Sequence, residues 1–472
     1  MARSKGKKRT MRFMPVAVIW LLFMAGLPGN AQEVLDDYIR TALENNLRLQ
    51  QSEHELQKRY LEVKKARSYF FPSIEFQARY SVARGGRTID FPVGDLLNPV
   101  YKNLNQINQD LYGHLPPEVQ PPEYPGVDNQ SFNFYRPSEH ETKLQLNQVI
   151  FSPEVYYSSQ ISKERLAAEK FSKQLMEREI IENVKTAYFS YLKTVQLANL
   201  LDNTREVLEE NLRVNKKLHA EDKVTRDHVH SSRAELQKLQ QQKAVAEKNR
   251  QSAQAWFNYL LNRPLDTNIV QDSIVLALPQ PVNLQALQDT AQHSRLEPRI
   301  LQARQRAAGE NVKRKRSQTI PELVGVVNYG FQGEKYRFTE EQDFAIASLV
   351  LRWPLFTGLR NKQEIQKAKV QQAIAENQYR QTQQKIRLDI IRAYYDYQAA
   401  EQAYEEAVMQ EQSRKSAFMI IEKKFENGQS SLLEYMHARN EKTSAEVNTI
   451  ISKYDILIKL AELEKAVAAK IR

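Results

Sequence analysis

The residues able to do acid–base or metal chemistry are unevenly placed along the chain. The sequence has eight histidines and no cysteine. Four of the histidines, His219, His228, His230 and His437, fall close to two sharp turns that are predicted below. Because histidine titrates near neutral pH and is a common metal ligand, one hypothesis is a pH- or metal-sensitive turn. His228 and His230 do not share a helix face, which favours the alternative of ordinary exposed residues.

Motifs of known enzyme chemistry are missing from the sequence. Carboxylates are plentiful, but there is no G-x-S-x-G, no H-E-x-x-H and no Walker-type glycine loop. The lack of cysteine also excludes a disulfide framework, a thiolate metal site and a lipid-modified cysteine. The sequence therefore predicts no catalytic residue, no cofactor site and no metal site, with a hydrolase as the enzymatic alternative.

The N-terminus has the pattern of a secretory signal peptide over residues 1–31. A basic segment precedes an apolar core from Phe13 to Gly26 and a small-residue end at Gly29-Asn30-Ala31. An uncleaved anchor is the alternative, but the apolar run is shorter than the ~20 residues of a spanning helix. No later run of about 18 apolar residues follows, so no further transmembrane helix is expected.

The charge pattern gives little support for nucleic-acid binding. Residues 1–31 hold six basic and no acidic residues, so their removal lowers the formal net charge from +11 to +5. The remaining Lys and Arg alternate with Glu and Asp, as in "EKKFENG", which is typical of a solvated helix surface. No nucleic-acid partner is predicted.

The mature chain consists of two similar internal repeats. A shift of 206 residues places Phe189 on Tyr395 and Tyr191 on Tyr397, and a shift of 249 places similar residues of the earlier parts on one another. The 43-residue difference predicts an insertion in the first copy. The proline-rich stretch 84–139 supplies it as a long exposed loop, which the family resemblance given below implies is extracellular. The first repeat is assigned to residues 32–282 and the second to residues 283–472.

Long helices are predicted in both repeats. There is neither proline nor glycine from Glu154 to Arg263, and apolar residues recur at spacings of three and four, which is typical of helices that bury one seam. The clustered tyrosines of "RAYYDYQAA" lie on adjacent faces, as expected of a helix with neighbours on both sides. The predicted long helices span residues 154–220, 224–262, 358–427 and 430–470.

Short strands alternate with these helices. In "SIEFQARYSV" apolar and polar residues alternate along the whole stretch, which predicts a strand with one apolar face. Four such strands are expected, at about residues 72–83, 142–151, 322–331 and 344–353. Each is about ten residues long, enough to cross a bilayer when tilted.

Four strands cannot close a membrane barrel by themselves. An open sheet edge in lipid leaves backbone groups without hydrogen bonds, so other chains must supply the missing strands. Three copies would give twelve strands and a pore, whereas two would give eight strands and a filled interior.

The order of these segments resembles the TolC family of outer-membrane efflux proteins, or outer membrane factors. "FPSIEFQARYS" and "IPELVGVVNYG" enter the first strand of each repeat, "IFSPE" and "LFTGLRN" leave the second, and "FENGQSSLLEYMHARNE" forms the far helical turn. The resemblance implies a mainly α protein with membrane β structure. In this fold, three chains build a twelve-stranded β-barrel, four strands from each, continued by a long α-helical coiled-coil tunnel.

The resemblance also implies partners and a location. The expected protein is a homotrimer that contacts lipid of the outer membrane of a Gram-negative bacterium, with its helices in the periplasm. It would serve as a passive exit duct in tripartite efflux or type I secretion, with a periplasmic adaptor (membrane fusion protein) and an inner-membrane pump of RND, ABC or MFS type. A periplasmic coiled-coil adaptor or a structural protein is the alternative, but neither needs strands with an oily face.

The resemblance places a gate at the tunnel tip in the second repeat. The turn falls at Asn427, Gly428 and Gln429, which are expected to contact the adaptor, and family members carry a ring of carboxylates just after it. Glu434 has the first such position. His437 stands where the family often has a second acid, which departs from the pattern of a double carboxylate ring.

The first repeat has its own version of this turn. Asp222 takes the place of Gly428, and Asp222 and Lys223 are expected at the tip. Asp227 or His228 would face the entrance, according to which of two alignments one residue apart is taken.

Overall fold

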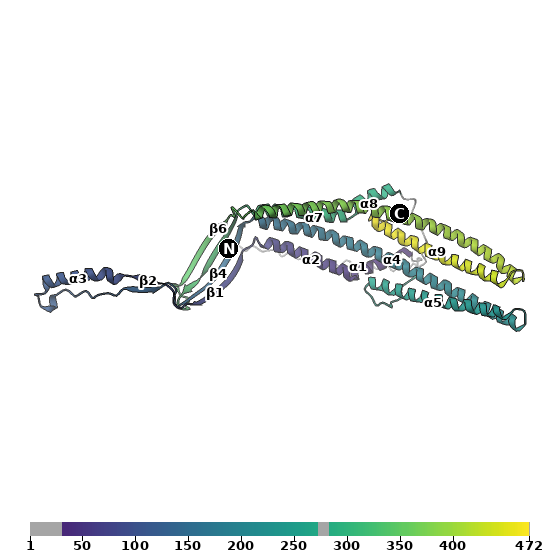
Figure 1. Cartoon of the computed structure of the whole chain (residues 1–472), viewed down its shortest axis with the longest axis horizontal. Helices are drawn as coiled ribbons and strands as arrows, with labels where there is room; N and C mark the ends of the chain where they lie inside the picture. The colour runs from purple at the N-terminus through teal and green to yellow at the C-terminus, as the bar shows by residue number, and fades with distance from the viewer. Residues whose placement is uncertain (1–30, 272–282, 472) are drawn as a thin grey trace, which may run out of the picture. The chain divides into compact units, whose positions relative to one another are not determined.

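The computed structural model describes residues 31–271 and 283–471 (Figure 1). The predicted signal peptide therefore lies outside the described residues except at Ala31. The chain divides into two compact units. We call them the helical unit, with residues 31–47, 177–287 and 391–471 as far as they are described, and the strand unit, with residues 48–176 and 288–390.

The elements follow the predicted order of helix, strand pair and long helix pair, twice. Their bounds are α1 Ala31–Asn45, α2 Leu47–Ser68, β1 Ser73–Val82, β2 Thr88–Phe91, α3 Val93–Tyr112, the 3-10 turn η1 Pro117–Val119, β3 Gln130–Asn133, β4 Ser138–Phe151, α4 Pro153–Ala220, α5 Arg226–Leu260, α6 Leu284–Ser294, α7 Glu297–Ser317, β5 Glu322–Gly333, β6 Asp343–Arg352, α8 Arg360–Glu426 and α9 Leu432–Val467.

The four long strands form one antiparallel sheet in the order β1-β4-β5-β6. The two repeats are joined by the β4–β5 pairing, so each repeat contributes one half of the sheet. Within the described chain, β1 and β6 are edge strands, each with one side not paired to another strand. The sheet is therefore open at both edges.

One face of this sheet is apolar across all four strands. Residues directly opposite each other in neighbouring strands share a face, so the register defines rows that cross the sheet. Two such rows contain apolar residues or tyrosine throughout: Ile74, Leu146, Val327 and Ala347 in one, and Phe76, Leu144, Tyr329 and Ala345 in the other. Large apolar side chains of these rows are exposed in the described chain. An exposed apolar face of this kind indicates contact with lipid or with another protein.

The opposite face is polar along β1 and β4 and mixed in β5, where Val326 lies on it as well as Asn328. Glu75 lies opposite Gln145, and Glu141 pairs with Arg79 at 3.1 Å and with Lys143 at 2.7 Å. The alternation weakens in β6, which places Phe344 and Ile346 on this face. The sheet thus separates an apolar side from a mostly polar side, as the period-two pattern predicts.

The proline-rich segment 84–139 differs from the expected loop because it contains the twenty-residue helix α3 and the β2–β3 hairpin (Figure 1). Pro92 caps the helix start, where a missing N–H is harmless, and Pro99 lies inside the helix. The remaining prolines of the segment, from Pro116 on, follow α3. The prediction of a loop was therefore wrong for residues 93–112, which form α3.

In the helical unit, α4 with α5 and α8 with α9 form antiparallel hairpins. Asn215 of α4 donates to Ser232 of α5 at 2.8 Å, and Arg414 of α8 pairs with Glu441 of α9 at 3.0 Å. Ion pairs also join α4 to α9, with Lys185–Glu464 at 2.6 Å and Lys193–Asp455 at 2.9 Å. These contacts hold the two hairpins side by side within the unit.

The tyrosines of α8 occupy different environments. Tyr397 is 4% exposed, whereas Tyr395 is 57% exposed. Burial raises the pKa of Tyr397. One face of α8 is thus packed within the chain, and the Tyr395 face stays open in a single copy.

Among the described residues, no helix is both long and apolar enough to span a membrane.

Candidate functional site at the helical turns

The α8–α9 turn closes with a backbone motif that requires a left-handed residue. Gly428 has φ +71°, and the amide of Gln429 donates to the Lys424 carbonyl at 2.7 Å while that of Gly428 donates to Phe425 at 3.0 Å. This pair of bonds defines a Schellman motif, in which glycine carries the left-handed conformation without a Cβ clash. The predicted turn residues therefore lie at the tip of this hairpin.

The α4–α5 turn repeats the same motif with an aspartate. Asp222 has φ +56°, and its amide donates to His219 at 3.0 Å while that of Lys223 donates to Leu218 at 2.9 Å. Aspartate tolerates this conformation better than most residues. Lys223 also pairs with Glu221 at 2.7 Å, which leaves the first tip with both signs of charge.

Glu434 does more than carry charge at the second turn. Ser431 caps α9, and its Oγ accepts from the Glu434 amide at 3.2 Å while the Ser431 amide donates to Glu434 Oε2 at 3.0 Å. The Ser430 hydroxyl donates to the same oxygen at 2.7 Å. These hydrogen bonds, led by the backbone N–H of Ser431, lower the pKa of Glu434. The carboxylate is exposed, ionised and fixed against the helix start.

The geometry of the first turn identifies the residue that corresponds to Glu434. Thr225 is the N-cap of α5, as Ser431 is of α9. Counting from the caps, His228 has the position of Glu434 and Asp227 lies one residue earlier. The Thr225 hydroxyl donates to Asp227, and this hydrogen bond lowers the pKa of Asp227. The two turns therefore differ in chemistry at matched positions, with carboxylate in one and imidazole in the other.

The four tip histidines do not assemble within one chain. His219 Nδ1 lies 3.1 Å from the Val224 carbonyl, and His230 and His437 are exposed. His228 is half-buried, and its Nδ1 has no hydrogen-bond partner among the described residues. Within the described chain, no group of three or more His, Cys, Asp or Glu side chains is arranged to hold a metal ion.

The two hairpins are held below their turns by different contacts. Tyr435 of α9 stacks on Phe425 of α8 at 4.7 Å between ring centroids and lies 5.6 Å from Phe418, in a cluster that also buries Leu432. The first hairpin has the polar Asn215–Ser232 contact close to its turn instead. Aromatic packing therefore stabilises the α8–α9 hairpin near its turn, and a buried hydrogen bond stabilises the α4–α5 hairpin near its turn.

Arg439 joins the two hairpins and was not singled out from the sequence as a site residue. It is 4% exposed, and its Nη2 lies 3.7 Å from Glu235 Oε2 of α5. Its Nε and Nη1 have no hydrogen-bond partner in the described chain, and burial lowers its pKa. The available signal was its spacing, because Arg439 continues the buried seam of Leu432 and Tyr435, where a charge is unusual.

A groove runs between α4, α5 and α9 in the helical unit. Its cavity of about 390 Å³ combines apolar and small polar side chains. The lining residues are Thr194, Leu197, Leu201, Gln242, Val245, Ala246, Asn249, Thr443, Ser444, Val447 and Asn448. Val245 is exposed there, so the groove offers an apolar strip on a helical surface.

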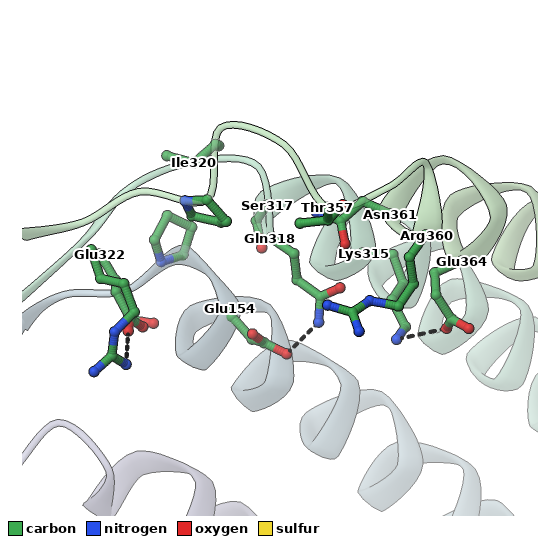
Figure 2. Close-up of a pocket in the computed structure, with 14 residues that line it drawn as sticks. Glu154, Lys315, Ser317, Gln318, Ile320, Glu322, Thr357, Arg360, Asn361 and Glu364 are labelled. Carbon is green, nitrogen blue, oxygen red and sulfur yellow. Dashed lines mark hydrogen bonds and ion pairs between the residues drawn. The ribbon is translucent and has the colours of Figure 1, made fainter.

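A second cavity, of about 470 Å³, lies in the strand unit where strands meet helices (Figure 2). Gln318 donates to Glu154 at 3.0 Å, and ion pairs Lys315–Glu364 at 2.9 Å and Arg352–Glu322 at 2.8 Å cross its walls. Each of the three acids has a partner. Around the cavity, one ion pair thus joins α7 to α8 and the other joins β5 to β6.

Comparisons with known proteins agree with this architecture. Residues 287–469 match the family model described as outer membrane efflux protein. None of the curated proteins compared with the chain matches it. The CmeC outer membrane channel of Campylobacter jejuni is similar in structure, with a TM-score of 0.75 at 17% identity over 93% of this chain and 86% of that chain.

Two further solved structures give the same result. The MtrE outer membrane channel of Neisseria gonorrhoeae, in its open state, has a TM-score of 0.71 at 18% identity and covers 93% of this chain and 90% of its own. The outer membrane protein VceC of Vibrio cholerae has a TM-score of 0.72 at 14% identity over 93% and 97%.

The chain therefore has the fold of the outer-membrane channels to which it is similar. Residues 287–469, most of the second repeat, match the outer membrane efflux protein family, and the described chain has the TolC-like fold of mainly long helices with an antiparallel sheet. The predicted fold class is confirmed, and the match of residues 287–469 agrees with the predicted family.

Proposed function

We propose that three copies of this chain form one passive duct across the outer membrane and periplasm. The observation that carries the proposal is the four-stranded sheet with an apolar face and two open edges. Such edges are unstable in lipid unless another strand pairs with them, and three sheets of four strands would close a barrel wide enough for a pore. The mostly polar face would then line the lumen.

The duct would be closed at its helical turns. Three copies of Glu434 around one axis would form a negative constriction that favours cations, and His228 would take the matched place on the other hairpin. The capping hydrogen bonds hold Glu434 in one position, as a narrow selective ring requires. Asp222, Lys223, Asn427, Gly428 and Gln429 lie at the tips, where they would meet the adaptor.

Opening would separate the two hairpins of each chain. The contact that opposes this movement is Arg439–Glu235, because it joins α9 to α5 close to the turns. The groove between α4, α5 and α9 offers a surface for a helical adaptor, whose apolar residues would pack on the strip around Val245. An inner-membrane pump would supply the energy, for tripartite efflux or for type I secretion.

Fractionation and bilayer recording together test this function. We expect the protein in the outer membrane fraction and, after purification, cation-selective conductance steps in planar bilayers. Recovery in the soluble periplasm or inner membrane, without conductance, would favour the periplasmic adaptor or structural alternative.

A further inference from the structure

The connection between β1 and β4 presents an apolar stripe that nothing in the described chain covers. On α3, Leu96, Val100, Ile107 and Leu111 are 70%, 50%, 51% and 57% exposed. They lie along one side of a helix of twenty residues. An exposed stripe of this length indicates an interaction surface.

The other side of α3 is fastened to the returning chain, which fixes the direction of the stripe. The Asn98 side chain exchanges two hydrogen bonds with the backbone of Val127, at 2.9 and 3.0 Å. Asn105 does the same with Tyr124, at 2.8 and 2.9 Å, and Tyr124 stacks on Tyr101. The polar side of α3 is thus occupied within the chain, and only its apolar side is left for a partner.

The spacing of the stripe is that of a coiled coil. Apolar residues recur at alternating intervals of four and three from Val93 to Leu111, which assigns a and d positions without ambiguity. The a positions are Leu97, Leu104 and Leu111, and the d positions are Val93, Val100 and Ile107. Leucine at a with β-branched residues at d favours assemblies of more than two helices.

The flanking residues are compatible with copies of the same helix. In a parallel coiled coil, each g residue faces an e residue of the neighbouring helix. Here Leu96 would meet Tyr101, and Asn103 would meet Asn108, so no like charges oppose one another. A membrane surface suits this helix less well, because its only basic residue is Lys102 and interfacial helices carry several.

We infer that the α3 helices of three copies pack against one another in parallel as a short three-stranded coiled coil. This inference rests on the proposed trimer. Val82 and Ser138, which flank the connection, pair directly, so α3 leaves each sheet at the end opposite to the start of α4. The three α3 helices would meet beyond that end of the barrel. They would add an interface between copies that is independent of the strand edges.

Single cysteines test this contact directly, because the chain has none of its own. Under mild oxidation of the full-length protein in outer membranes, I107C places a thiol at a d position, where neighbouring helices are close enough for a disulfide. We expect covalent dimers from I107C, since one disulfide joins two of three chains. The matched control K102C lies at an f position, directly opposite the stripe, and we expect it to stay monomeric.

Two further measurements separate this inference from the proposed trimer. Adding L104D to I107C should abolish the covalent dimer while the native mass in mild detergent stays that of three chains. A trimer by native mass in which I107C gives no more dimer than K102C would overturn the coiled coil alone. A protein that is not a trimer by native mass would overturn the proposed function and this inference together.

Discussion

The buried ion pair between Arg439 and Glu235 gives the sharpest test of the gating scheme. The Arg439 side chain is 5% exposed and that of Glu235 is 23% exposed, with 3.7 Å between Nη2 and Oε2. At this distance the Coulomb attraction is about 1 kcal/mol in water and about 4 kcal/mol at an effective dielectric constant of 20. Desolvation of the arginine opposes this gain. The pair therefore stabilises contact between the hairpins only while both partners are present.

Two substitutions at this pair should have unequal effects. Glu235→Gln leaves a buried arginine whose Nε and Nη1 already have no hydrogen-bond partner among the described residues, so we expect the hairpins to separate more easily by about 1–3 kcal/mol. Arg439→Met removes the buried charge and leaves a partly exposed carboxylate that water can solvate. We expect Arg439→Met to change stability by less than about 1 kcal/mol.

Native-state hydrogen exchange measures this difference locally. A change of 1–3 kcal/mol corresponds to about 5–150-fold faster exchange of amides that open with the tips, which we expect over residues 215–240 and 420–445 for Glu235→Gln. Exchange near the Lys185–Glu464 pair serves as the internal control. Equal acceleration by both substitutions, or acceleration by Arg439→Met alone, would show that an unpaired buried Arg439 is not what separates the hairpins.

The remaining predictions concern the caps and charges of the turns. Ser431→Ala removes a side-chain capping bond and should destabilise the start of α9 by about 1 kcal/mol. This loss would be seen as faster amide exchange at the start of α9. Thr225→Ala is the control, because the Thr225 side chain makes no capping bond in the described chain, and an equal effect of both substitutions would contradict the capping role of Ser431. Glu434→Gln keeps the capping-box arrangement but removes the charge, so reversal potentials in bilayers should show lower cation selectivity with normal trimer assembly, whereas unchanged selectivity would remove Glu434 from the gate. The pKa of Glu434 in the folded protein lies below its ordinary value of 4.5. The contribution of Glu434 to stability is therefore present above pH 4.5 and is lost only as the pH falls through the lowered pKa. Between about pH 5 and 8, ionisation of Glu434 should not change the rate of amide exchange at the tips. If conductance does vary in that range, His228→Asn should abolish the variation under the histidine hypothesis, and a conductance that is constant throughout would remove that hypothesis.

Most of the secondary structure could be predicted from the sequence because its signals are local and periodic. The alternation in Ser73–Val82 gives β1 within one residue, and the absence of glycine and proline after Glu154 gives α4. The helix α3 was missed because prolines on either side obscured its heptad, although Pro92 and Pro99 are compatible with the helix that forms.

The site could be located but not described. The position of the turns follows from Gly428 and its repeat partner Asp222, yet the match of His228 to Glu434 needed the caps of both helices. The role of Arg439 depends on burial and on a partner more than 200 residues away along the chain. Such contacts are set by packing between helices, which a single sequence does not specify.

The native mass of the protein extracted from outer membranes in mild detergent decides whether three copies assemble. The open edges of β1 and β6 must be paired by other copies if the apolar face lies in lipid. Three paired copies would give a mass of three chains plus bound detergent. A stable species of one or two chains would contradict it, because the four-stranded sheet would then have to be completed in some other way.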